Sequence, residues 1–384
     1  MPGAAPAAAG RYRPRSPSNA LKEIVGDHLE ELLRVWDERF RKEVGPLSPR
    51  LSQLFDAFGR CGDPHFGFLR LRCPGCGEEK LLPFSSKARG LCPSCQRKRA
   101  LLWAERMVEE VLPPVPYVQL VFTIPKMLRP YFLWDRSLYG ALSRAAYDST
   151  RELFQAHYPA LKRAVPAMVI SPQSFGSLLN FHPHLHSVCS LGVFDREGKF
   201  HAAGDLDFSS LEEMFRQRTL GMMLKEGKIT PGRAELLRSW VHSGFAVNAD
   251  RRVEPEDREG LQSLLEYMER APVSLERLSY LPDGRVLYRG NFHPGLRTDH
   301  RLVSGVEFMP ILECASNRSR PARIRIPKVL PQGARASSSP SSCRSLRPWC
   351  WPQVAAPFAP CSITLRSAPW SACRPSVSPA SPSS

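Results

Sequence analysis

The sequence lacks every feature that would place it in a membrane. Its 384 residues contain no apolar run of about 18 residues, the length that a membrane-spanning helix needs. Residues 1–20 have no apolar stretch after their charges and so do not resemble a secretory signal. We therefore expect a cytoplasmic protein with no membrane partner, and a disordered Ala/Pro/Arg-rich leader over residues 1–18. The chain also lacks internal repeats.

Acidic residues are absent after Glu313. Residues 314–384 contain ten Lys and Arg, 12 Pro, 16 Ser and five Cys, a composition that cannot bury much apolar surface. We expect a disordered tail over residues 313–384. The tail carries ten of the sixteen net positive charges, and the remaining six belong to the body of the chain. A basic balance favours nucleic acid as partner, although the body is less basic than the total suggests.

The cysteines outside the tail are clustered. Without a secretory signal, clustered cysteines are more often metal ligands than a disulfide framework. Cys73, Cys76, Cys92 and Cys95 follow the spacing C-x2-C-x15-C-x2-C, which predicts a closed, structural zinc ribbon; chance or redox cysteines are the alternative. Basic residues around it suit contact with phosphates. Cys61 and His65 lie close by as candidates for a second site, but no partner pair accompanies them.

Only ten histidines occur in the chain, and three of them alternate in "NFHPHLHSV", residues 180–188. A strand sends His182, His184 and His186 to one face, which is either a polar surface face or a site for a divalent metal. If "SLLN" is the turn of a hairpin, Gln173 falls opposite His184. Gln173, His184 and His186 then suit Mg²⁺ or Mn²⁺ holding a phosphate. His182, followed by Pro183, is better placed for a supporting role.

Cleavage of a phosphodiester that a metal polarises also requires a nucleophile. The helical segment "LQSLLEYMERAP" contains Tyr267, with Arg270 on an adjacent face. An activated tyrosine can attack phosphorus and hold a DNA end covalently, although a helical tyrosine alone is usually core or surface filler. Lys126 and Arg129 are candidates for phosphate contacts, with a solvated face as the alternative.

The coarse pattern predicts an α+β protein with an antiparallel sheet. We expect two helices over residues 19–58 broken near Gly45, a buried strand in "YVQLVFTIP", and one long helix from residue 133 to 158. Asp283-Gly284 predicts a second hairpin turn.

At these residues the sequence resembles the HUH-tyrosine transposases of rolling-circle insertion sequences, the insertion sequence 91 family. HUH stands for two histidines around a bulky apolar residue, here His184-Leu185-His186. The resemblance runs from about Arg13 to Leu312 and includes "CGDPHFGFLRLRCPGC", "RGLCPSCQRKRA", "VFTIPKMLRPYF", "SFGSLLNFHPHLH" and "APVSLERLSYLPDGRVLYR".

The resemblance implies a zinc-binding domain that recognises element ends, here residues 19–104, and a ferredoxin-like (RRM-like) HUH nuclease domain, here residues 105–312. It implies that His184 and His186 hold Mg²⁺ or Mn²⁺ against the scissile phosphate while Tyr267 attacks it. The products are a 5′-phosphotyrosine and a free 3′-OH, and transfer to a target strand reverses the step. The implied partner is single-stranded DNA, bound by a protein associated with the bacterial nucleoid.

The chain departs from the family pattern in three places. Some members carry two tyrosines four residues apart, whereas Ser263 stands four residues before Tyr267 here, which implies a single-tyrosine arrangement. Relatives usually have a cysteine where this chain has Ser86, and that weakens the case for a second metal site with Cys61 and His65. Relatives continue past the equivalent of residue 312 into a Tyr-rich, Arg-Gly segment. A frameshift near residue 313 would produce the acid-free tail found here, and a basic DNA-binding tail is the alternative.

Two other functions fit parts of the sequence. A zinc-ribbon DNA-binding protein without chemistry, either a regulator or a decayed transposase, has no reason to keep the His184/His186 pair and Tyr267 in this order. A plasmid-type replication initiator shares the HUH chemistry, but the cysteine module and "TIPKMLRP" favour a transposase. Because the tail is aberrant, the sequence leaves the activity of this chain open.

Overall fold

The computed structural model describes residues 19–47, 49–86, 90–161, 163–293, 295–315, 323–325 and 376–380. These residues fall into two units. The larger comprises the described parts of residues 1–61 and 85–329, and the smaller those of residues 62–84 and 330–384. The predicted leader and most of the predicted tail lie outside the described residues.

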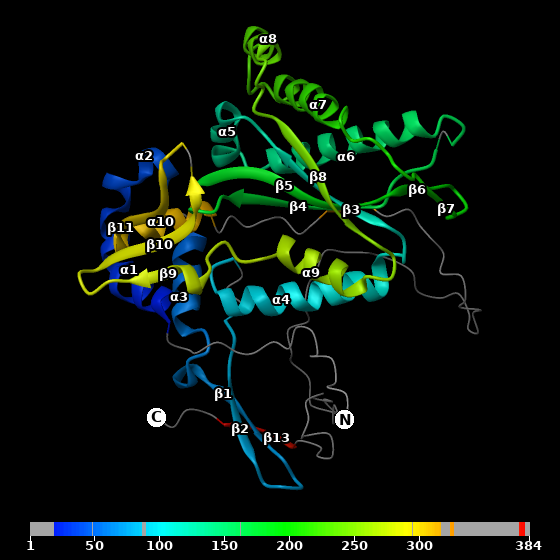
Figure 1. Ribbon diagram of the computed structural model, residues 1–384. Coiled ribbons are helices and arrows are strands. Elements are labelled where there is room, and N and C mark those ends of the chain that lie inside the picture. Colours follow the sequence, from blue (N-terminus) through cyan, green and yellow to red (C-terminus); the bar gives the residue numbers. More distant parts are fainter. Residues whose placement is uncertain are drawn as a thin grey trace. The chain divides into compact units, whose positions relative to one another are not determined.

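The larger unit is built on a five-stranded sheet with the strand order β12-β4-β5-β3-β8, all neighbours being antiparallel (Figure 1). Its strands are β3 (Tyr117–Thr123), β4 (Met168–Phe175), β5 (Phe181–Ser190), β8 (Ala246–Val253) and β12 (Arg323–Arg325). Alternate residues of a strand face opposite sides, and in β5 Leu185 and Cys189 enter one hydrophobic core while Val188 enters another. The sheet therefore separates two cores.

One face of this sheet is covered by α5 (Arg129–Trp134), α6 (Leu138–His157) and α7 (Leu211–Lys225), with α8 (Pro231–Ser239) against α7. Phe122 of β3 and Phe215 of α7 pack edge to face with ring centroids 4.9 Å apart. The expected single helix over residues 133–158 is instead two helices, because Asp135 accepts hydrogen bonds from the backbone and hydroxyl of Ser137 and ends α5. Two short strands, β6 (Gly192–Phe194) and β7 (Phe200–Ala202), form a separate hairpin.

The opposite face is covered by α4 (Pro93–Arg106) and α9 (Arg258–Met268), which lie side by side in Figure 1. A π-helical turn, η2 (Met107–Val111), continues α4. Apolar residues of these helices, among them Ala104, Leu264 and Leu265, pack against Val169 and Val188 of the sheet. The helix that carries Tyr267 is thereby held against β5, the strand that carries the three histidines.

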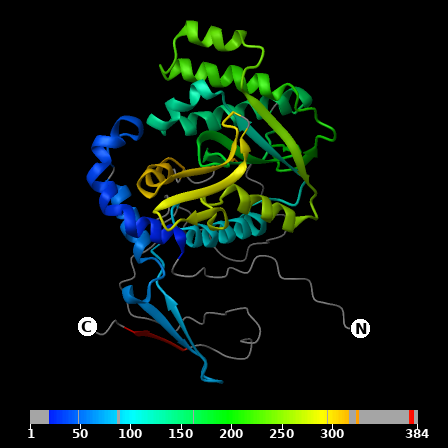
Figure 2. The same ribbon diagram turned by 60° about the vertical axis from the view of Figure 1, so that its left-hand side comes forward.

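A second group of elements packs at one end of the larger unit. It contains α1 (Ala20–Arg39), α2 (Arg41–Val44), α3 (Pro49–Arg60) and α10 (Gly305–Ala315), with the sheet β11-β10-β9 (Thr298–Ser304, Arg285–His293, Leu278–Tyr280). Figure 2 shows α10 beside α1, and the two share a hydrophobic core. The predicted helix break and hairpin turn are confirmed, with Gly45 and Gly284 at positive φ of 98° and 78°.

The smaller unit is a three-stranded antiparallel sheet with the order β13-β1-β2. Its elements are η1 (Pro64–Phe66), β1 (Phe68–Arg72), β2 (Glu79–Pro83) and β13 (Ser376–Ala380). Arg70 and Glu79 form a bidentate ion pair across β1 and β2 at 2.9 and 2.6 Å. Of the predicted tail, the structure describes the end of α10 and the strands β12 and β13.

Helices packed on antiparallel sheets make this an α+β protein, as the sequence predicts. No helix in the described ranges is long and apolar enough to cross a membrane.

Candidate functional site

Two histidines of β5 face α9 with their ring nitrogens close together. The Nε2 atoms of His184 and His186 lie 3.1 Å apart, and the two residues are only 7% and 6% exposed. Two nitrogens bound at right angles to one ion, each at about 2.1 Å, lie about 3 Å from one another. The pair is therefore spaced to share one cation.

A backbone acceptor sets the tautomer of His184. Its Nδ1 lies 2.7 Å from the carbonyl oxygen of His182. A carbonyl can only accept, so Nδ1 carries the proton and the lone pair is on Nε2, the atom that faces His186. Histidines that bind metals are commonly held in this way through their other ring nitrogen.

Burial favours the neutral form of all three histidines. Desolvation is the main cause that lowers the pKa of His184 to about 4 and that of His186 to about 3, and the positive charge of Arg270 adds to both. The pKa of His182 is lowered to about 3, by desolvation first and then by His184. Neutral imidazole is the form that offers a lone pair to a metal.

Gln173 of β4 pairs directly with His184 of β5, the register that the turn "SLLN" predicts. Its Nε2 donates to the carbonyl oxygen of Met268 at 3.0 Å. Its Oε1 is buried and has no hydrogen-bond partner in the described part of the chain. An unpaired buried oxygen costs about 1–3 kcal/mol, a cost that a bound cation removes. An amide oxygen with two imidazoles is a donor set that suits Mn²⁺ or Mg²⁺.

Helix α9 brings Tyr267 to the same place. Its ring stands edge-on to His186, with centroids 5.5 Å apart and an interplanar angle of 88°. The guanidinium carbon of Arg270, just beyond the helix, lies 4.2 Å from the centre of the Tyr267 ring, within the range of a cation–π contact. Tyr267 is 41% exposed. An exposed tyrosine ring thus lies beside two buried imidazoles.

Polar residues that sequence reasoning missed lie beneath this group. The Nε2 of Gln119, on β3, lies 3.4 Å from Nδ1 of His186. The Ser171 hydroxyl donates to Oε1 of Glu269 at 3.0 Å, and burial raises the pKa of Glu269 while Arg99 opposes the shift. The sequence contains a sign of two of these residues. Gln119 is a polar residue inside the apolar run "YVQLVFT", and Ser171 precedes Gln173 by two positions, so both point to the same face of the strand.

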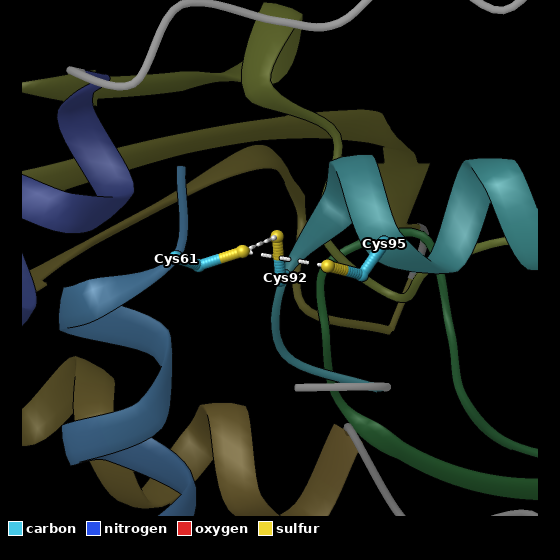
Figure 3. A group of neighbouring side chains, drawn as sticks. All are labelled: Cys61, Cys92 and Cys95. Atoms are coloured by element: carbon cyan, nitrogen blue, oxygen red, sulfur yellow. Dashed lines mark hydrogen bonds between the residues drawn. The ribbon is translucent and has the colours of Figure 1, made fainter. Parts of the chain in front are cut away.

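Three cysteines form a second group in the larger unit. Cys61 directly follows α3, Cys92 caps the start of α4, and Cys95 lies in the first turn of α4. Figure 3 shows their sulfur atoms pointing toward one another. The Sγ of Cys61 lies 3.7 Å from that of Cys92 and 3.4 Å from that of Cys95. The potential ligand atoms all lie within 4.8 Å of one another, so the three can hold one metal ion.

Two serines adjoin the cysteine group. The hydroxyl of Ser85 lies 3.0 Å from Sγ of Cys95, and Ser86 hydrogen bonds to the Cys61 sulfur through its side chain and its backbone. The Cys92 and Cys95 thiols, followed by Ser86, lower the pKa of Cys61, because each donates to its sulfur.

Two family models match the chain. The model described as a transposase zinc-binding domain matches residues 32–124, which include the three clustered cysteines. The model described as a putative transposase matches residues 168–325, which include β4, β5 and α9. Over these two segments the chain is similar to the insertion sequence 91 family of transposases.

Two curated proteins resemble this chain. "Transposase for insertion sequence element IS801" of Pseudomonas savastanoi pv. phaseolicola is 27% identical over 246 residues, which are 59% of this chain and 57% of that protein. "Putative transposase y4qJ" of Sinorhizobium fredii (strain NBRC 101917 / NGR234) is 28% identical over 174 residues, 45% of this chain and 43% of that protein. The chain spans about half the length of the curated relatives it matches. No solved structure matches it.

The other predicted zinc ligands of the chain lie in the smaller unit. Cys73 closes the turn after β1, where its N–H donates to the carbonyl of Glu78 at 2.8 Å, and Cys76 is exposed in the same turn. His65 belongs to η1, and its Nδ1 lies 2.8 Å from the carboxylate of Asp63. The four-cysteine set stays a prediction, since Cys92 and Cys95 belong to the larger unit, where Cys61 joins them.

The remaining predicted site residues lie around the histidines. The His182 ring stacks on that of His184 with centroids 5.0 Å apart. Arg129 donates from Nε to the carbonyl of Ile124 at 3.3 Å, and its charge contributes to the lowered pKa values of His182 and His184. Lys126 is exposed in the 3-10 turn η3 (Lys126–Leu128). Of Lys126 and Arg129, Arg129 is therefore the one whose charge favours the neutral form of His182 and His184.

Proposed function

We propose that this transposase cleaves and rejoins one DNA strand at the ends of its element through a 5′-phosphotyrosine on Tyr267. The main support for the proposal is that the side chains of Tyr267, His186 and His184 lie close together. The ring of Tyr267 lies 5.5 Å from that of His186, and the Nε2 of His186 lies 3.1 Å from that of His184. A structural tyrosine has no need of two buried, neutral imidazoles beside it.

The topology of the larger unit supports a ferredoxin-like nuclease domain. Along the chain the elements run β3-α6-β4-β5-α7-β8, and in the sheet the four strands lie in the order β4-β5-β3-β8. Helix α6 connects β3 to β4, with β5 between them in the sheet, and α7 connects β5 to β8, with β3 between them. Two such helical connections are typical of the βαββαβ arrangement. This arrangement puts β5 in the middle of the sheet, where α9 covers it.

His184, His186 and the amide oxygen of Gln173 would hold Mg²⁺ or Mn²⁺. Such an ion polarises a phosphate oxygen and stabilises charge in the transition state. Tyr267 attacks the scissile phosphorus through its phenolic oxygen, which gives up its proton as the new Oη–P bond forms. The P–O3′ bond breaks, and the departing strand leaves with a 3′-OH. Arg270, over the Tyr267 ring, offsets the negative charge of the attacking phenolate.

Rejoining is the same step in reverse. A 3′-OH on the target strand attacks the phosphotyrosine, the Oη–P bond breaks, and Tyr267 recovers its proton. One phosphodiester replaces another, so no external energy source is required. The single tyrosine, with Ser263 four residues earlier, means that each cleavage must be resolved before the next one at the same site.

Basic residues beside Tyr267 are suited to the flanking DNA. A pocket of about 360 Å³ is lined by Arg97, Arg270 and Arg277 together with Glu266 and Glu276. Guanidinium groups bind phosphates in bidentate fashion, so we assign this pocket to the backbone of a single strand next to the cleaved bond. The zinc-binding domain would recognise the element ends, and the protein would act in the bacterial cytoplasm at the nucleoid.

The test is covalent capture of DNA. Purified protein is mixed with single-stranded oligonucleotides spanning the element ends and with Mn²⁺ or Mg²⁺, and adducts are separated on a denaturing gel. Adducts that depend on the ion and disappear in Tyr267→Phe and in His184→Ala support the proposal, while Tyr131→Phe serves as a tyrosine control. An adduct that survives Tyr267→Phe moves the nucleophile elsewhere.

A DNA-binding protein without chemistry is the competing function. Binding of the oligonucleotides without any adduct, under every ion tried, would favour it and would mean that this chain retains only the DNA contacts. The 3.1 Å approach of His184 and His186 argues against it, because a pure binding protein gains nothing from burying two imidazoles together.

A further inference from the structure

The three clustered cysteines are arranged as one face of a tetrahedron. In a tetrahedral site with zinc–sulfur bonds of about 2.3 Å, neighbouring sulfurs lie about 3.8 Å apart. The distances from Cys61 Sγ are 3.7 Å to Cys92 and 3.4 Å to Cys95. A disulfide requires about 2.05 Å and joins only two sulfurs. These two distances, with all three sulfurs within 4.8 Å of one another, are compatible with ligands around one ion.

The backbone holds these sulfurs in place from two helices. The N–H of Cys61 donates to the carbonyl of Phe58 at 3.1 Å, and the carbonyl of Cys92 accepts from Gln96 at 3.0 Å. Cys61 and Cys92 are 8% and 5% exposed and belong to one hydrophobic core. Ligands fixed in this way lose little freedom when the ion binds.

The turn at Ser85 and Ser86 supplies oxygen beside two of the three sulfurs. Ser85 lies 3.0 Å from Cys95 Sγ, and Ser86 hydrogen bonds to Cys61. We propose that Cys61, Cys92 and Cys95 are the three thiolate ligands of a zinc ion whose fourth ligand is an oxygen held at this turn, from a serine hydroxyl or from water. The inference does not rest on the proposed nuclease chemistry.

The proposed site is incompatible with a zinc ribbon in which Cys73, Cys76, Cys92 and Cys95 bind one ion, the arrangement that the C-x2-C-x15-C-x2-C spacing predicts. A tetrahedral ion that takes Cys61, Cys92 and Cys95 has one position left. Cys73 and Cys76 therefore cannot both bind the same ion, and Cys61 becomes a primary ligand. A site with three thiolates and an oxygen also binds soft ions less tightly than four thiolates do.

The proposed zinc joins the end of α3 to the start of α4. From α4, Gln96, Arg97 and Arg99 reach α9, which carries Tyr267. The ion thus fixes the helix on which the catalytic helix rests, a role distinct from reading DNA.

Cobalt substitution tests the ligand set. Full-length protein is loaded with Co²⁺, and the metal content and the cobalt–thiolate charge-transfer absorption are measured. The double variant Cys73→Ser/Cys76→Ser should keep one ion with thiolate absorption, and adding Cys61→Ser should abolish or sharply reduce it. Cys189→Ala, which changes a buried cysteine outside the group, is the matched control. Circular dichroism checks that each variant folds.

Ser86→Cys tests the fourth position separately. Replacing the oxygen by a fourth thiolate should raise the charge-transfer absorption per bound ion by about one third and tighten binding. The ligand assignment is overturned if the Cys73→Ser/Cys76→Ser variant folds but loses the cobalt–thiolate absorption, or if Cys61→Ser leaves that absorption unchanged. An unchanged spectrum in Ser86→Cys would overturn the oxygen ligand at the turn.

Discussion

The side-chain amide of Gln96 donates a buried 2.7 Å hydrogen bond to the carbonyl oxygen of Glu269. Gln96 follows the last clustered cysteine, and Glu269 follows α9 two residues after Tyr267. Nearby, Arg97 pairs with Glu266 at 3.4 Å and Arg99 with Glu269 at 3.6 Å. Helix α4 therefore holds the end of α9 through three polar contacts, two of them to Glu269.

Removing the Gln96 donor should loosen this end of α9. In Gln96→Ala the Glu269 carbonyl stays buried without its partner, which costs about 1–3 kcal/mol. We expect the urea midpoint of unfolding to fall accordingly with an unchanged slope, and adduct formation by Tyr267 to slow. Gln262→Ala is the control, because that amide donates to Glu266 within α9, at 3.1 Å, and does not join α9 to α4. Equal losses in the two variants would contradict a special role for Gln96.

Arg270 should matter for the reactivity of Tyr267 more than for stability. Its guanidinium carbon lies 4.2 Å from the Tyr267 ring centre, a contact that contributes about 0.5–2 kcal/mol depending on desolvation. Arg270→Gln should therefore slow adduct formation by about 2- to 30-fold, and Arg270→Lys should lose less because the charge is kept. Rates come from single-turnover reactions with a labelled oligonucleotide. If Arg270→Lys loses as much as Arg270→Gln, the positive charge is not what Tyr267 needs.

Local sequence patterns predicted the histidine hairpin and its register. The alternation in residues 180–188 and the turn "SLLN" sufficed to place Gln173 opposite His184, because the period of a strand is two. The approach of Cys61 to Cys92 was not predictable in this way. It depends on how the end of α3 packs against the start of α4 in a shared core. The spacing of cysteines along the sequence does not predict that packing.

Strand β8 was missed for a different reason. Its sequence, "AVNADRRV", has no apolar alternation, because the strand lies at the edge of the sheet with four of its eight residues exposed. The meeting of Tyr267 with His186 likewise followed from the packing of α9 on the sheet. The sequence indicated which residues are candidates for chemistry, and tertiary packing determined which of them lie together.

Gln119 should position His186 as a metal ligand. Its amide nitrogen now faces Nδ1 of His186 at 3.4 Å, which leaves the proton on Nε2. With a cation bound, Nε2 needs its lone pair, so the amide must turn and accept from Nδ1–H with its oxygen. We expect Gln119→Leu to weaken Mn²⁺ binding at the histidines by about 10- to 100-fold, measured calorimetrically without DNA. Gln119→Glu keeps an acceptor and should bind at least as well as the unaltered chain; weaker binding there would refute the positioning role.

Glu269 should make the stability of the fold depend on pH. Burial raises its pKa above the usual 4.5, and Arg99 and the Ser171 hydrogen bond only partly oppose this. Because the folded state holds the proton more tightly than the unfolded chain, the contribution of Glu269 is fully present below pH 4.5 and is lost as the pH rises through the raised pKa. Glu269→Gln keeps a partner for Ser171 but cannot ionise, so its free energy of unfolding relative to the unaltered chain should increase from pH 4.5 to pH 8. Glu266→Gln, on the same helix and 13% exposed, is the control. A stability difference that stays constant with pH would show that Glu269 keeps its charge in the fold as easily as in water.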